Sequence, residues 1–212
     1  MSRRATTADH DHDHGHHEHD HVHGHDHDQP EHEAPEAERE AMEKALRKRV
    51  ALSQIRQYGD PVLRMAAPPV ETFGDELERV AERMFSLMHD AEGIGLAATQ
   101  VGLLRRFFVC SLDGEDRVFV NPVIERADGR PETESEGCLS LGPVRVDVER
   151  QVEVTVSAAD AKGVRFTLEL QGLEARVVQH EFDHLDGKLI IDRTDEASRK
   201  EALGQLRPRL AL

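Results

Sequence analysis

Residues 173–184, LEARVVQHEFDH, are the stretch of sequence that determines the expected fold. Their apolar and chemically active side chains recur at helical spacing, which predicts an amphipathic helix with one face turned towards the core. The residues on or near this face are Leu173, Val177, His180, Glu181 and His184. Because the last five residues have the pattern H-E-x-x-H, the same helix brings two imidazoles to one side.

Short strands are predicted ahead of this helix. Residues 106–112 and 117–120 are apolar runs separated by a turn, and the pair Asn121-Pro122 is expected to end the second run. Apolar residues alternate with polar ones at 152–156 and again at 164–170, on either side of a second turn. Both pairs of segments are expected to form antiparallel hairpins.

The order of the elements predicts the fold class. A helix is expected over residues 75–91, with Asp75 as its N-cap and Glu78 as the reciprocal partner. Strands grouped ahead of the HEFDH helix, without β-α-β alternation, favour an α+β fold over a doubly wound sheet. We therefore expect a single domain in which antiparallel strands pack around a central helix carrying HEFDH.

The chain divides into segments of unlike composition. Residues 1–35 form a tail rich in His, Asp and Glu, which holds eleven of the fourteen histidines and is expected to be disordered. The composition of residues 36–52 predicts a linker helix. A catalytic domain is expected over residues 53–194, followed by a C-terminal helix within 195–212 that ends near Pro208.

Composition also excludes several classes of protein. The 212 residues carry a formal net charge of −15, which argues against direct recognition of nucleic acids. No stretch approaches the roughly 20 apolar residues of a membrane span, and no export signal is recognised. Two cysteines, Cys110 and Cys138, are too few for a disulfide framework. We expect a cytoplasmic monomer without membrane contact.

The HEFDH motif is the main candidate for chemistry. His180 and His184 lie four residues apart, so both imidazoles can bind one metal ion, and Glu181 can then reach a water on that ion. The alternative is a core histidine beside a solvated acid. Outside this motif and the tail, the chain contains only one histidine, His89, which favours the metal site.

A third ligand is expected, because catalytic zinc-type sites usually have three protein ligands and an exchangeable water. Cys138 in residues 136–140, EGCLS, is the candidate, and Gly137 before it permits a close approach of the backbone to a substrate. The alternative for Cys138 is a small buried apolar residue. Cys110 fits that alternative better, because it lies within an apolar run.

Residues 93–100, GIGLAATQ, are the third motif. They match a dinucleotide-binding G-x-G-x-x-A pattern, but that site requires a preceding strand, and a helix is predicted there instead. Gly93 and Gly95 suit a backbone that lies along an extended ligand. Gln100 offers an amide N–H donor at the end of the segment.

The three motifs in this order, together with residues 59–64 (GDPVLR), resemble the peptide deformylase family. The resemblance extends over about residues 53–193. It implies a metal-dependent hydrolase that removes the formyl group from N-formylmethionine of nascent polypeptides and releases formate.

The resemblance also implies roles for individual residues. Glu181 would be the general acid/base. Gln100 and the backbone N–H of Leu139 would stabilise the negative charge that develops on the formyl oxygen. The implied metal ligands are Cys138, His180 and His184.

Substrate contacts are implied as well. The backbones of Ile94 and Gly137 would pair with the peptide as an added strand. Arg145 would face the peptide further from the formyl end, and a solvated strand residue is the alternative. The family usually has an aliphatic residue and a proline after residues 138–140, whereas this chain has Leu141-Gly142-Pro143, so a differently shaped substrate rim is expected. The full set of expected substrate-binding residues is Gly93, Ile94, Gly95, Gly137, Leu173, Arg176, Val177 and Arg145.

One divalent metal per active site is expected. The resemblance implies Fe²⁺, and Zn²⁺, Ni²⁺ or Co²⁺ could also occupy a Cys/His/His site. The tail offers ligands for further, weakly bound metals. The ribosome is a candidate partner through basic residues near the C-terminus, with an ordinary solvated helix as the alternative. These basic residues are Arg199, Lys200, Arg207 and Arg209.

Two other functions are compatible with parts of the sequence. A zincin-type endopeptidase shares H-E-x-x-H, but its third ligand usually follows the helix, whereas Cys138 precedes it. A metal-storage or metal-sensing protein built around the tail would keep its metal-dependent behaviour without Glu181. The tail could also be only a solvated acidic segment that gains positive charge below about pH 6.5.

Overall fold

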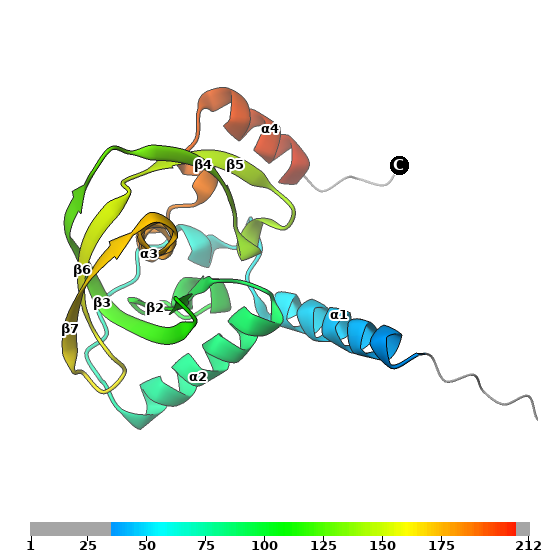
Figure 1. Ribbon diagram of the computed structural model, residues 1–212, viewed down its shortest axis with the longest axis horizontal. Coiled ribbons are helices and arrows are strands. Elements are labelled where there is room, and N and C mark those ends of the chain that lie inside the picture. Colours follow the sequence, from blue (N-terminus) through cyan, green and yellow to red (C-terminus); the bar gives the residue numbers. More distant parts are fainter. Residues whose placement is uncertain (1–34, 207–212) are drawn as a thin grey trace, which may run out of the picture. The chain divides into compact units, whose positions relative to one another are not determined.

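Alternating apolar residues build a five-stranded antiparallel sheet with the strand order β1-β2-β3-β6-β7 (Figure 1). The computed structural model describes residues 35–206, so the predicted tail and the last residues of the predicted C-terminal helix lie outside the described part. The strands are β1 Gly95–Ala97, β2 Phe107–Leu112, β3 Glu115–Asp128, β6 Glu153–Ala159 and β7 Arg165–Gln171. Both predicted hairpins are confirmed, because β2 pairs with β3 and β6 with β7, each antiparallel.

β3 is longer than predicted, since it continues through Asn121 and Pro122 to Asp128. The register shifts after Val120, where Asn121 adopts a left-handed φ of 50°. The Asn121 side chain donates to the carbonyl of Val70 and accepts from its N–H, both at 2.8 Å. The resulting bulge accommodates a proline that has no N–H for the ladder. The predicted strand end at this position is therefore wrong.

A second, two-stranded sheet is present that the sequence analysis did not predict. β4 Glu132–Gly137 and β5 Arg145–Arg150 pair antiparallel. Val146 and Val148 of β5 are buried, and Asp147 between them is exposed. Because Cys138 directly follows β4, this hairpin determines where its thiol lies.

Four α-helices accompany the sheets within residues 35–206. They are α1 Glu36–Gln54, α2 Asp75–Asp90, α3 Gly172–Leu185 and α4 Glu196–Leu206. Short 3₁₀ helices cover Pro61–Arg64, Ala98–Val101, Leu139–Leu141 and Ile190–Asp192. The N-cap of α2 is Gly74, so the prediction of Asp75 as a capping residue is wrong. Asp75 and Glu78 lie in the first turn instead, where acidic side chains interact favourably with the helix dipole.

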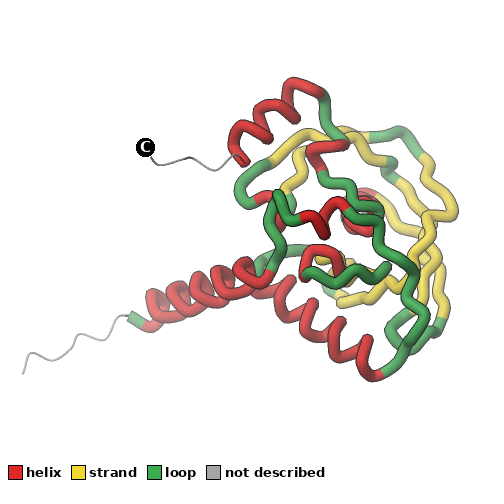
Figure 2. The backbone as a smooth tube through the Cα atoms, turned by 180° about the vertical axis from the view of Figure 1, so that it is seen from behind, coloured by secondary structure: helices red, strands yellow, loops and turns green. Residues whose placement is uncertain are grey.

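α3 lies at the centre of the fold, with strands of both sheets around it (Figures 1 and 2). Its residues Ala175, Val178 and Leu185 join the core of the larger sheet. In the same core, the rings of Phe108 and Phe119 stack with their centroids 4.8 Å apart. The predicted α+β class, with antiparallel strands packed around the HEFDH helix, is confirmed. No helix among residues 35–206 has both the length and the apolar character needed to cross a membrane.

Candidate active site

The polar face of α3 and the residue after β4 bring three potential metal ligands together. The Sγ atom of Cys138 lies 3.3 Å from Nε2 of His184. The ring centroids of His180 and His184 are 5.0 Å apart, and one ligand atom from each of the three residues lies within 4.8 Å of the others. The structure therefore groups the three residues that the sequence analysis selected as ligands.

The donor set fits a divalent transition metal. A thiol and two imidazoles are the ligand types that such ions prefer. Burial lowers the pKa of His184 well below its usual value, so this ring stays neutral and able to bind a metal. Among the described residues, no group hydrogen-bonds Nδ1 of buried His184.

Glu136 orients the other imidazole. Its Oε2 atom lies 2.9 Å from Nδ1 of His180, which leaves Nε2 of that ring as the nitrogen for a metal. Burial opposes ionisation of both groups. The hydrogen bonds from His180 and Arg150 nevertheless lower the pKa of Glu136. The hydrogen bonds of His180 to Cys138 and Glu136 raise the pKa of His180 to about 10. The acidic surroundings thus favour a positive charge at His180, which a metal cation can supply.

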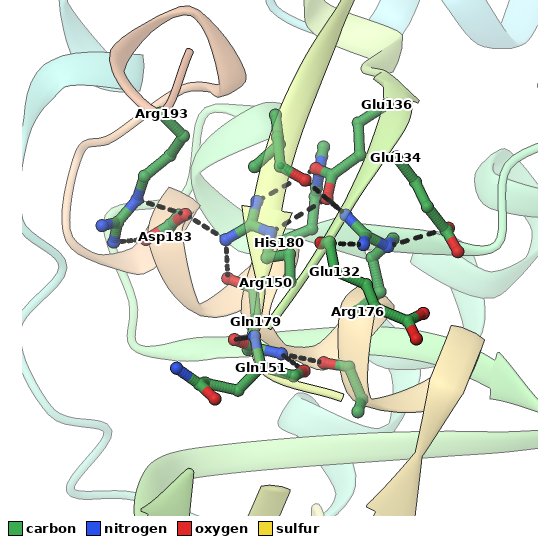
Figure 3. A network of polar contacts seen from close by, with 12 residues as sticks. Glu132, Glu134, Glu136, Arg150, Gln151, Arg176, Gln179, His180, Asp183 and Arg193 are labelled. Carbon is green, nitrogen blue, oxygen red and sulfur yellow. Dashed lines mark hydrogen bonds and ion pairs between the residues drawn. The ribbon is translucent and has the colours of Figure 1, made fainter. Parts of the chain in front are cut away.

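A buried charge network holds Glu136 in place (Figure 3). Arg150 donates to both carboxylate oxygens of Glu136, at 2.9 and 3.0 Å. The same guanidinium donates to Asp183 at 2.6 Å, and Arg193 reaches Asp183 from outside. Because Asp183 belongs to the HEFDH motif on α3, the network ties β4, β5 and α3 together.

Sequence analysis missed this network. Glu136 and Asp183 lie inside two of the quoted motifs, but their roles depend on Arg150, which lies in no motif. The only sequence signal for the position of Arg150 is the alternation of Val146 and Val148 just before it. That alternation predicts a strand that would bring Arg150 beside Glu136.

Glu181 is buried against the backbone of β1. It is 4% exposed, and burial raises its pKa to about 7. Among the described residues, nothing hydrogen-bonds its Oε2 atom. A Cβ atom at Gly95 would lie 2.3 Å from Glu181 Oε1, so the glycine is required here for close contact with the carboxylate. The sequence-based expectation that the backbone at Gly95 lies along an extended ligand is compatible with this contact, because Gly95 also lines the cavity at this site.

Gln100 points its amide nitrogen towards Cys138. Its Oε1 accepts a hydrogen bond from the N–H of Ala97 at 2.8 Å, which fixes the orientation of the amide. Its Nε2 lies 3.1 Å from Oγ of Ser140 and 3.6 Å from Sγ of Cys138. Leu139 begins the 3₁₀ helix that follows Cys138. The two predicted oxyanion donors therefore lie on either side of the cysteine.

One cavity of about 480 Å³ connects these groups. Every residue predicted to bind substrate lines it, and so do the catalytic candidates and two of the three predicted metal ligands. His184 is not among the lining residues and is 1% exposed. The predicted site residues that line the cavity are Gly93, Ile94, Gly95, Gln100, Gly137, Cys138, Leu139, Arg145, Leu173, Arg176, Val177, His180 and Glu181.

Two of the lining arginines differ in their contacts. Arg176 is buried, and its guanidinium contacts Glu136 at 2.8 Å and Glu134 at 3.0 Å, so its charge is already paired. Arg145 is exposed and donates to the carbonyl and hydroxyl oxygens of Ser135. Arg145 is thus the more accessible cation on the cavity wall. Gly142, in the turn that departs from the family pattern, also lines the cavity.

Known proteins share this sequence pattern. A family model described as polypeptide deformylase matches residues 52–200. The peptide deformylase of Thermotoga maritima is 44% identical over 146 residues, which are 69% of this chain and 89% of that relative. Peptide deformylase 1 of Corynebacterium efficiens is 44% identical over 162 residues, which are 74% of this chain and 96% of that relative.

Solved structures share the fold. The crystal structure of a peptide deformylase from Synechococcus elongatus in complex with actinonin matches with a TM-score of 0.69 and 41% identity, covering 71% of this chain and 85% of that one. A peptide deformylase from Legionella pneumophila matches with a TM-score of 0.69 and 40% identity, covering 72% and 91%. The chain therefore belongs to the polypeptide deformylase family, whose members use a catalytic metal to remove the N-formyl group from nascent peptides.

Proposed function

We propose that this chain deformylates formyl-methionyl peptides with Cys138, His180 and His184 as metal ligands and Glu181 as general acid/base. The observation that carries the proposal is the meeting of this Cys/His/His group with a buried, protonatable glutamate at one cavity. When bound, a divalent ion would supply Lewis-acid assistance and lower the pKa of water.

Glu181 has the properties of a proton shuttle. With a pKa raised to about 7, its carboxylate exchanges protons readily near neutral pH. In the proposed reaction it accepts a proton from the attacking water and passes it to the departing amine of methionine. The missing side chain at Gly95 leaves the space that the carboxylate occupies.

Two donors support the developing negative charge on the formyl oxygen. The amide of Gln100 is held by the N–H of Ala97, so little reorientation is needed during the reaction. The backbone N–H of Leu139 is the second proposed donor. Loss of one such donor typically costs ~10²–10³ in rate.

The peptide is proposed to lie along the cavity as an added strand. The backbone edges at Ile94 and Gly137 line the two sides, and main-chain pairing of this kind binds peptides without reading their sequence. Ile94 is 46% exposed and Leu173 is 60% exposed at the cavity. Together with Val177 they offer apolar surface for the methionine side chain.

The proposal is distinguished from its alternatives by the reaction products. Mass spectrometry of a formyl-Met tripeptide after incubation with the metal-loaded chain should detect the intact deformylated peptide. Cleavage of a peptide bond would indicate the zincin-type endopeptidase instead. An unchanged peptide would favour the metal-storage alternative.

We propose Fe²⁺ as the physiological ion because the resemblance to the deformylase family implies it, whereas the donor set alone accepts several transition metals. A thiolate beside ferrous iron is sensitive to oxygen, so activity of the iron form should fall on exposure to air. Anaerobic loading of separate samples with Fe²⁺, Zn²⁺, Ni²⁺ and Co²⁺ compares the four ions. An iron form that keeps full activity in air would contradict this choice.

The histidine-rich tail is proposed to hold additional, weakly bound metals. Eleven histidines between His10 and His32, interleaved with acids, supply many possible ligands. Deleting residues 1–34 should lower the metal stoichiometry and slow reactivation of the metal-free enzyme at limiting metal. If both values are unchanged by the deletion, the tail does not buffer metal.

The cellular setting also remains a proposal. A cytoplasmic monomer that meets nascent chains at the ribosome would suit the substrate. On α4, the guanidinium of Arg199 lies 3.3 Å from a carboxylate oxygen of Asp192, so this charge is partly neutralised by an ion pair within the chain. Co-sedimentation of the chain with ribosomes, compared with the double variant Arg199→Gln and Lys200→Gln, tests this contact.

A further inference from the structure

Helix α1 adds a wall to the active-site cavity. Residues 36–51 of this helix precede the region that the family model matches. Two α1 residues, Lys48 and Leu52, nevertheless line the same cavity as Cys138 and Glu181. Ala51 and Ile55 are buried in the core beside α2, so the end of α1 is packed against the domain. The helix lies alongside the end of α2 in both views (Figures 1 and 2).

Two lysines of α1 attach it to the substrate-binding segment. Lys44 Nζ lies 2.8 Å from Oε1 of Glu92, and Lys48 Nζ contacts Oε2 of the same carboxylate. Glu92 directly precedes Gly93 and adopts a left-handed φ of 59°. The ion pairs therefore hold α1 next to the backbone edge that is proposed to pair with the peptide.

Half-exposed Lys48 and exposed Arg145 are two cations that line the cavity. Lys44 and Lys48 share the single carboxylate of Glu92. Arg145, which lines the same cavity, donates hydrogen bonds to the neutral Ser135. The nearby acidic Glu134 is already paired with Arg176. A substrate at this cavity can thus meet the ammonium of Lys48, which shares its only carboxylate partner with Lys44.

We propose that Lys48 is a specificity-determining residue that favours formyl-Met peptides with an acidic side chain one or two residues after the methionine. The inference rests on the deformylase function proposed above. Lys48 is half exposed, so the attraction is screened by solvent. An exposed charge pair of this kind changes binding by a factor of about two to five.

Lys44 provides a matched control. Both lysines pair with Glu92 and both belong to α1, but only Lys48 lines the cavity. Lys44→Gln and Lys48→Gln therefore each remove one ion pair to Glu92, and only the second changes the charge that faces the substrate.

The experiment compares kcat and KM for formyl-Met-Ala-Glu, formyl-Met-Ala-Gln and formyl-Met-Ala-Lys. A second series places Glu, Gln or Lys directly after the methionine. The wild-type chain should prefer Glu over Gln over Lys, mainly through KM, and the preference should weaken with added salt. Lys48→Gln should reduce the Glu-to-Lys ratio by about two- to five-fold, and Lys48→Glu should reverse the order. Lys44→Gln should reduce the ratio clearly less than Lys48→Gln, because Lys44 pairs with Glu92 but does not line the cavity.

Equal ratios in wild type and Lys48→Gln would overturn the inference, and so would an equal loss in both Lys→Gln variants. Thermal unfolding of each variant shows whether the fold is retained. Turnover of the neutral Gln peptide distinguishes failure of the role inferred for Lys48 from failure of the proposed deformylase function. If that peptide is deformylated but the charge preference is absent, only the role of Lys48 fails. If no peptide is deformylated, the proposed function fails and this inference fails with it.

Discussion

The backbone of Gly95 leaves no room for a Cβ atom beside the present position of the Glu181 carboxylate. In Gly95→Ala the new methyl group would lie 2.3 Å from Glu181 Oε1, so the carboxylate must move. A displacement of about 1 Å in a catalytic group can cost ~10² in rate, and we expect a loss of kcat of that order. Steady-state kinetics on a formyl-Met peptide measures it.

The control for this variant is Gly204→Ala on α4. Nothing lies within 4 Å of a Cβ at Gly204, so the same substitution there should leave kcat unchanged. A Gly95→Ala enzyme with normal kcat would mean that the position of Glu181 does not limit the reaction.

Cys110 should behave as an unreactive thiol. Burial raises its pKa well above the usual value, and the charge of Glu181 raises it further. A raised pKa keeps the thiol protonated, so thiolate chemistry should be absent up to about pH 9, where an exposed cysteine reacts readily. Alkylation followed by peptide mapping should find Cys110 unlabelled in the native chain and labelled after denaturation. Labelling of the native protein at pH 8 would contradict the burial argument.

At the scale of elements, the β4-β5 hairpin supports the metal site through Glu136. Glu136→Gln keeps the shape of the side chain but removes the charge that faces His180 and Arg150. Loss of a residue that hydrogen-bonds a metal ligand typically weakens metal affinity 10–100-fold, and we expect a loss in this range. Competition with a metal chelator measures the affinity without relying on turnover.

Glu134→Gln is the matched control, because it changes the same residue type two positions earlier in β4. Glu134 is 56% exposed and lies against Arg176 rather than a metal ligand. Its substitution should leave metal affinity unchanged. Similar losses in both variants would show that general acidity of β4, and not the contact with His180, matters for metal binding.

The sequence was informative where apolar residues alternate or recur. The hairpins β2-β3 and β6-β7 and the helices α2 and α3 follow from such periodicity. β4 could not be found this way, because its sequence ETESEG contains no apolar residue. It becomes a strand only through pairing with β5, which is a tertiary contact. The bulge at Asn121 was missed for a similar reason, since its side chain is held by Val70, far away in the sequence.

At the scale of the whole molecule, the short motifs predicted which residues meet, and the fold determines what surrounds them. Cys138 and His180 lie far apart in the chain, and their grouping was expected only because H-E-x-x-H requires a further ligand. Arg150 and Lys48 could not be assigned from the sequence, because each acts through elements that are distant along the chain. Residues outside the motifs, such as Arg150, therefore also support the site.

The central claim is that a metal held by the Cys/His/His group and a proton shuttle at Glu181 together remove the formyl group. The most direct test is formate release from a formyl-Met peptide by the anaerobically loaded Fe²⁺ or Ni²⁺ enzyme, beside Glu181→Ala and a metal-free sample. The account predicts turnover by the loaded wild-type chain and nearly complete loss in both controls. Turnover that survives Glu181→Ala, or its absence from the correctly loaded wild-type protein, would contradict it.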